Sequence, residues 1–144
     1  MMRSLRLLPL ALLLAVSGCD SGSDPDDASV FSGPYEGQIT ASFFNGATAE
    51  YEIRLDLDEP DVNGRYDGTV RIARAQGAAD AVTVTGDAFG LVTGSAITLS
   101  STAGGGDFGF GGEGTLSGST LQLTAATLTD PAFGGSDSFS ITLR

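Results

Sequence analysis

The 144-residue chain contains no histidine, no lysine and no tryptophan, and Cys19 is its one cysteine. Histidine and lysine are the bases that usually activate a serine or cysteine nucleophile, so the common nucleophilic triads are excluded. A zinc or copper site built from histidine and cysteine ligands is excluded for the same reason. A single cysteine also rules out an intramolecular disulfide. These absences predict a protein that is not an enzyme.

Positive charge is scarce as well. Seven arginines stand against 18 aspartates and glutamates, which gives a formal net charge of −11. An acid excess of this size disfavours binding to nucleic acid and electrostatic attraction to anionic lipid, and it favours solubility. We therefore expect no nucleic-acid partner.

The first 18 residues follow the three-part order of a secretory signal peptide. Residues 1–6 carry two arginines and no acid, and residues 7–16 form an apolar run. A membrane-spanning helix needs roughly 20 apolar residues, so this run is too short to favour a retained transmembrane anchor.

The residues that close this run, Val16-Ser17-Gly18-Cys19, resemble the lipobox of bacterial lipoproteins. The resemblance implies cleavage between Gly18 and Cys19, acylation of Cys19, and a protein held on the membrane outside the cytoplasm, in the periplasm or at the cell surface. Two or three acyl chains on one residue give stable attachment, since a single chain binds marginally. The alternative is a secreted protein with an unpaired thiol near its cleavage site.

The composition divides the chain into three segments. Residues 1–18 are the signal peptide, and the chain beyond them holds five arginines against 18 acids, or −13. Residues 19–32 are small, polar and acidic, with almost no apolar surface to bury, which predicts a disordered tether. From Gly33 to Arg144 the pattern changes to an alternation of period two, which is typical of strands with one buried face.

The alternation predicts eight strands in residues 33–144. The residues expected to face inward are, strand by strand, Tyr35, Gly37, Ile39, Ala41 and Phe43; Tyr51, Ile53, Leu55 and Leu57; Tyr66, Gly68, Val70 and Ile72; Val82 and Val84; Ile97 and Leu99 of a fifth strand over 91–99; Phe108, Phe110, Gly112, Gly114 and Leu116; Leu121, Leu123 and Ala125; Phe139, Ile141 and Leu143. Turn signals are expected at Asn45-Gly46, Asn63-Gly64, Gly86-Asp87, Gly104-Gly105-Gly106, Ser117-Gly118 and Gly134-Gly135.

Short strands joined by tight turns predict an all-β domain, a single eight-stranded antiparallel up-and-down meander. Closing the meander into a small barrel hides its apolar face and protects its edges, with a β-sandwich as the alternative. We expect no substantial helix outside the signal peptide. An eight-stranded barrel is just wide enough to be filled by its own side chains or to hold one small ligand.

Two short stretches resemble lipocalin-like (calycin-type) barrels. Gly33-Pro34-Tyr35-Glu36-Gly37 is similar to their Gly-x-aromatic opening, and residues 114–124 resemble hairpins of small lipocalin-like bacterial lipoproteins. The resemblance spans residues 33–144 in architecture and implies a barrel. The chain departs from the family in having tyrosine at the usual tryptophan position, and it lacks the flanking C-terminal helix and the later loop motifs. The resemblance therefore does not imply a lipocalin-type ligand.

Three functions remain open. The first is binding of a small hydrophobic ligand in a cavity lined by three inward tyrosines, Tyr35, Tyr51 and Tyr66. The inward glycines could leave room for that ligand, or they could only permit the strong coiling of a small barrel. The second is a structural or partner-binding envelope protein with a filled core. The third, a carboxylate-dependent enzyme, needs inward acids, whereas the strand acids expected to face outward are Glu52, Asp56, Asp58 and Asp67.

The densest cluster of oxygen ligands lies in the loop before the third strand. Glu59, Asp61, Asn63 and Gly64 match the first half of a calcium loop. The twelfth position of that pattern is Val70 instead of glutamate, and no helices flank the loop. An acidic hairpin loop is the favoured interpretation, with weak Ca²⁺ binding as the alternative. We expect no other cofactor.

Overall fold

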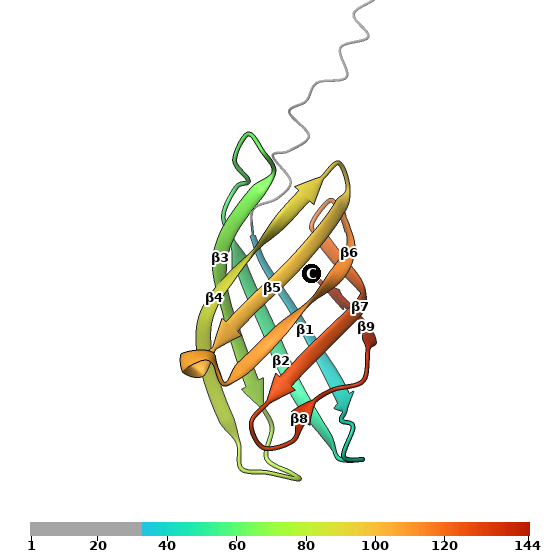
Figure 1. Cartoon of the computed structure of the whole chain (residues 1–144). Coiled ribbons are helices and arrows are strands. Elements are labelled where there is room, and N and C mark those ends of the chain that lie inside the picture. Colours follow the sequence, from blue (N-terminus) through green and yellow to red (C-terminus); the bar gives the residue numbers. More distant parts are fainter. Residues whose placement is uncertain (1–32) are drawn as a thin grey trace, which may run out of the picture.

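The computed structural model describes residues 33–144, so the predicted signal peptide, the tether and Cys19 lie outside the described residues. The domain is all-β, as predicted, and its strands wrap into one curled sheet (Figure 1). No helix in this part of the chain is long and apolar enough to cross a membrane. The elements are β1 (Gly33–Ser42), β2 (Thr48–Leu57), β3 (Arg65–Arg74), β4 (Val82–Thr93), β5 (Ala96–Ala103), η2 (Gly104–Gly106), β6 (Phe108–Ser117), β7 (Thr120–Asp130), β8 (Gly134–Gly135) and β9 (Phe139–Leu143).

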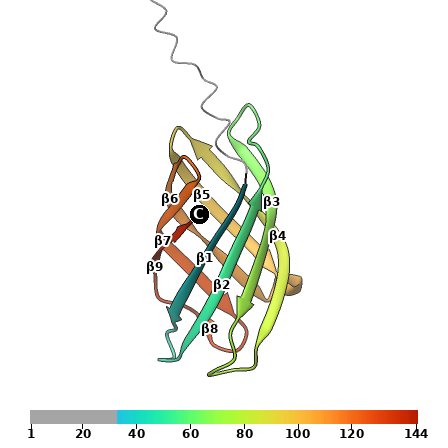
Figure 2. The same ribbon diagram turned by 180° about the vertical axis from the view of Figure 1, so that it is seen from behind.

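The sheet is an antiparallel meander in which β1 to β8 pair in chain order and β9 pairs with β7. Its two ends meet at two points. Glu36 and Arg144 exchange backbone hydrogen bonds of 3.0 Å in both directions, and Phe43 forms a bridge with Ser136. Figure 2 shows β1 beside β9 at this seam, where the ladder pairing of the sheet does not continue. The sheet thus curls into a barrel that is fastened at both ends of the seam.

One face of each strand fills the interior. The clearest case is β2, in which every second residue from Ala49 to Leu57 is buried and the residues between them are exposed or half-buried. Aliphatic and aromatic side chains from β1 to β7 and β9 pack together in a single core inside the curled sheet. Burial of these side chains is the main stabilising contribution, at about 25 cal/mol per Å² of apolar surface.

The boundary between the fourth and fifth strands differs from the prediction. Gly86-Asp87 is not a turn, because β4 continues through it to Thr93, and the turn lies at Gly94, which has a φ of 61°. Gly86 faces the neighbouring strand β5 so closely that a side chain there would overlap the Thr102 carbonyl oxygen. The glycine at residue 86 therefore serves close strand packing, which a sequence pattern cannot distinguish from a turn.

A bulge in β7 overturns one predicted inward residue. The registers of β7 with β6 and with β9 both shift within residues 123–127. Thr124 and Ala125 are both exposed, and Ala126 is buried in place of Ala125. An extra residue in one strand reverses the alternation beyond it. From this point Ala126, Leu128 and Asp130 face the interior.

Candidate functional site

The most chemically distinctive group in the interior is a buried ion pair between β3 and β7. Arg74 Nη1 donates hydrogen bonds to both carboxylate oxygens of Asp130, 2.6 Å from Oδ1 and 2.5 Å from Oδ2. The Tyr51 hydroxyl donates to Asp130 Oδ2 at 2.6 Å, and the backbone N–H of Ala132 donates to Oδ1 at 2.8 Å. Asp130 is 0% exposed. We call Tyr51, Arg74 and Asp130 the buried cluster.

The rest of the Arg74 guanidinium is also occupied. Its Nε and Nη2 atoms donate to the Asp80 carbonyl oxygen at 3.0 and 2.8 Å, which ties the loop after β3 to the cluster. The guanidinium carbon lies 5.4 Å from the centre of the Phe133 ring, and that ring lies 4.9 Å from the ring of Phe43. No buried side-chain nitrogen or oxygen in the described residues lacks a hydrogen-bond partner. The buried cluster is therefore a satisfied structural element that leaves its carboxylate no free position for a substrate.

Sequence reasoning missed this cluster for two reasons. Arg74 continues the inward series of Tyr66 to Ile72, but a charged residue in an inward position is usually taken as a strand end. Asp130 faces inward only because the bulge in β7 has reversed the alternation before it. The sequence pattern places no acid securely inward, whereas Asp130 is buried on the inward face of β7. Glu52, Asp56, Asp58 and Asp67 are exposed, as predicted.

The three inward tyrosines are buried, as predicted, but they do not gather around one space. Tyr51 pairs with Arg74 of β3. Tyr35 pairs with Leu55 of β2, and Leu55 in turn pairs with Val70 of β3, so Tyr35 lies at the level of Val70. At about 3.3 Å per residue, the positions of Tyr66, Val70 and Arg74 are spread over roughly 26 Å of strand. The Tyr66 hydroxyl donates to the Thr98 carbonyl oxygen at 2.6 Å. Each ring is thus packed into the wall or core at its own level.

The tyrosines give a direct test of this packing by alkaline titration. Burial raises the pKa of Tyr35 and Tyr66, and burial together with the hydrogen bond to Asp130 raises the pKa of Tyr51. A folded-state pKa above the unfolded value of about 10 contributes stability that is present below that pH and is lost as pH rises further. We expect no tyrosinate absorbance near 295 nm until the barrel unfolds in alkali, then one cooperative step. Gradual titration near the unfolded pKa would contradict the packing.

Three of the four inward glycines serve strand coiling. A Cβ atom at Gly68 would overlap the Asp56 carbonyl oxygen, one at Gly114 would overlap that of Gln122, and one at Gly112 would lie 2.7 Å from that of Ala125. At Gly37 a Cβ atom would lie 2.6 Å from the side chain of Leu143. The space beside each glycine is already taken by protein, so these residues leave little room for a ligand.

The acidic loop before β3 is organised by Asp61. Its Oδ1 atom accepts the backbone N–H of Asn63 at 2.8 Å and that of Arg65 at 2.9 Å. These hydrogen bonds, that of Arg65 first, lower the pKa of Asp61. Glu59, Asp61 and Asn63 thus form a hairpin loop, and the described residues contain no group of three or more aspartates, glutamates, histidines or cysteines placed to hold a metal.

The outer surface carries two kinds of feature. Exposed ion pairs join Arg54 to Glu36 and Asp56, and Arg71 to Glu52; solvent and salt screen exposed pairs of this kind, so they contribute little to stability. A hollow of about 750 Å³ lies over β3, β4 and β5 and is lined by Phe89, Leu91 and several acids. What distinguishes this hollow is that two large exposed apolar side chains, Phe89 and Leu91, line it.

Comparison with known proteins adds no relative from which an activity could be transferred. No protein family, no curated protein and no solved structure matches this chain.

Proposed function

We propose that this protein is a lipid-anchored component of a bacterial cell envelope whose β-barrel is a filled, non-catalytic module that binds a partner through its outer face. The observation that carries the proposal is the interior: aliphatic and aromatic side chains and the buried cluster occupy it. A carrier of a small hydrophobic ligand needs an apolar pocket, typically about 300–1,000 Å³. Because the tyrosines expected to line such a pocket are separated along the strands, we favour surface binding over carriage.

The anchoring part rests on the sequence of residues 1–19. The positive segment, the short apolar run and Val16-Ser17-Gly18-Cys19 support removal of residues 1–18 and acylation of Cys19. Multiple acyl chains on Cys19 would hold the module at the membrane surface. Its acidic surface suits a partner with a basic or amphipathic contact region, whose association would weaken as salt rises.

Growth of the host with an alkyne-bearing fatty acid tests the anchor. We expect label on the wild-type protein, recovery of that protein in the membrane fraction, and loss of label after Cys19→Ala. Ser17→Ala is the control, since small residues are tolerated before the lipobox cysteine, and it should retain the label. Recovery of unlabelled wild-type protein in the soluble secreted fraction would contradict the anchoring proposal.

A further inference from the structure

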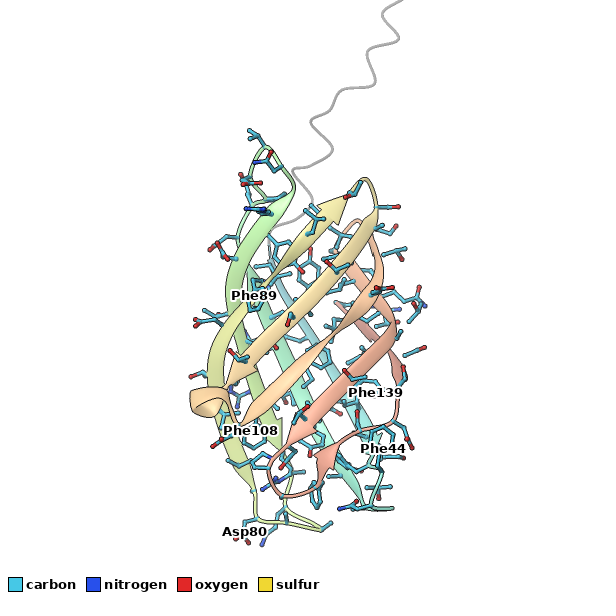
Figure 3. All side chains as sticks on the ribbon, viewed as in Figure 1. Phe44, Asp80, Phe89, Phe108 and Phe139 are labelled. Carbon is cyan, nitrogen blue, oxygen red and sulfur yellow. The ribbon has the colours of Figure 1, made fainter. Side chains whose placement is uncertain are left out.

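The outer face of the sheet carries one apolar pair. Phe89 is 46% exposed and Leu91 is 43% exposed, both on β4. The other exposed large hydrophobic residues in the described chain are Phe44 and Val62, which lie in turns. Figure 3 shows Phe89 in the half of the barrel away from the loop that holds Asp80. This phenylalanine and leucine lie on a strand face that is otherwise polar, and no other part of residues 33–144 covers them.

The neighbours of this pair form the hollow. Phe89 lies opposite Asp67 on β3 and Ser100 on β5, and Leu91 lies opposite Arg65 and Thr98. Gly90, between them, lacks a side chain, and the inward ring of Tyr66 crosses that position to reach the Thr98 carbonyl oxygen. The hollow has a volume of about 750 Å³, within the range of roughly 300–1,000 Å³ that is typical of binding sites.

The rim of the hollow is acidic. Asp58, Glu59, Asp61 and Asp67 line it against one arginine, Arg65. The Asp61 carboxylate is held by backbone N–H groups, whereas the carboxylates of Asp58, Glu59 and Asp67 form no hydrogen bond or ion pair with the described part of the chain. An apolar floor beneath uncompensated carboxylates is complementary to an apolar ligand flanked by cations.

We propose that the hollow over β3–β5 binds an extended segment of a partner protein in which two apolar side chains, two residues apart, are flanked by arginine or lysine. This inference rests on the proposed function, because it names the surface and the chemistry of the partner. Side chains at i and i+2 of an extended chain lie on one face about 6.6 Å apart, the same spacing as Phe89 and Leu91 on β4. The flanking cations would then reach the rim acids.

Charge disfavours two other occupants. A second copy of residues 19–144 would bring five arginines against 18 acids to a surface that is itself acidic. A membrane of anionic lipid would meet the same repulsion from Asp58, Glu59 and Asp67. A basic and apolar protein segment satisfies both the floor and the rim.

A peptide titration tests the proposal on the protein as purified from its host in neutral detergent. The probe is acetyl-Lys-Arg-Leu-Ser-Leu-Arg-Lys-amide, compared with peptides that replace its basic residues by acids or its leucines by serine. We expect saturable binding of the probe alone, with a Kd on the order of 100 µM, as for a small transient contact. Phe89→Thr and Leu91→Thr should each weaken binding about tenfold, because they remove the apolar floor.

The rim is tested with a matched pair of charge changes. Asp67→Asn should weaken binding about threefold at low salt, and the difference should disappear near 1 M salt, where the Debye length is about 3 Å. Asp107→Asn removes the same charge beside η2, outside the hollow, and should leave the Kd unchanged. Phe89→Thr and Leu91→Thr are compatible with the fold, because threonine is favoured in strands.

Equal binding of the acidic peptide, full binding by both threonine variants, or no saturable binding of the probe would each overturn the inference. These outcomes leave the proposed function standing if the same preparation carries acylated Cys19 and no interior ligand. A stoichiometric ligand inside the barrel would instead overturn the proposed function, whatever the peptides do.

Discussion

Replacing Asp130 by alanine is expected to lower the free energy of unfolding by about 3–5 kcal/mol, because it leaves the buried Arg74 guanidinium without its counter-charge. The side chain of Arg74 is only 8% exposed, so water cannot compensate for the lost carboxylate. The Tyr51 hydroxyl and the Ala132 N–H lose their acceptor in the same step. Urea denaturation at neutral pH, followed by far-UV circular dichroism, measures the change.

Two further variants show whether the ion pair itself is responsible. Asp137→Ala removes an exposed carboxylate a few residues along the chain and should change stability by less than about 0.5 kcal/mol. The double replacement Arg74→Met with Asp130→Leu removes both charges, and we expect it to cost less than Asp130→Ala alone, because no buried charge is left unpaired. If Asp130→Ala were as stable as Asp137→Ala, the cluster would not fasten β3 to β7 as described.

Gly90→Ala is expected to destabilise the barrel by about 3 kcal/mol although it adds one methyl group. That methyl would overlap the Thr98 carbonyl oxygen and the Tyr66 hydroxyl, so β4 would have to move away from β5 or the Tyr66 ring would have to leave its position. Thermal unfolding reports the loss of stability. The near-UV tyrosine signal should change with it, since the surroundings of Tyr66 are altered.

Gly77→Ala is the matched control for this change. A Cβ atom at residue 77 would have no heavy atom within 4 Å, and the residue does not have a positive φ, so the same substitution should be neutral to within about 0.5 kcal/mol. Equal stability of the two alanine variants would contradict close packing of β4 against β5 at residue 90. Such a result would show that the sheet is coiled less tightly than the structure indicates.

The strands that could be predicted from the sequence are those in which alternation is regular. Tyr51 to Leu57 and Phe139 to Leu143 lie where period-two patterning places them, because one face of each strand is apolar and the other polar. Glycine was ambiguous for a physical reason. A missing side chain suits a turn at Gly94 and close strand packing at Gly86 equally well, and the sequence does not distinguish the two.

The candidate sites depend on tertiary structure to a greater extent than the strands do. Asp130 becomes an interior residue only after the bulge in β7, and its partner Arg74 is 56 residues away in the chain. The hollow combines a loop before β3 with the outer faces of β3, β4 and β5. Sequence alternation places Asp67 on the outside, but it does not show that Phe89 lies directly beside it. Cross-strand register supplies that information.

Native mass spectrometry of the protein purified from its host tests the central claim, a filled barrel that acts through its outer face. We expect the mass of residues 19–144 plus the acyl groups on Cys19, with no further adduct. A stoichiometric small molecule that is retained in the folded state and released on unfolding would contradict the claim, and it would identify the protein as a carrier.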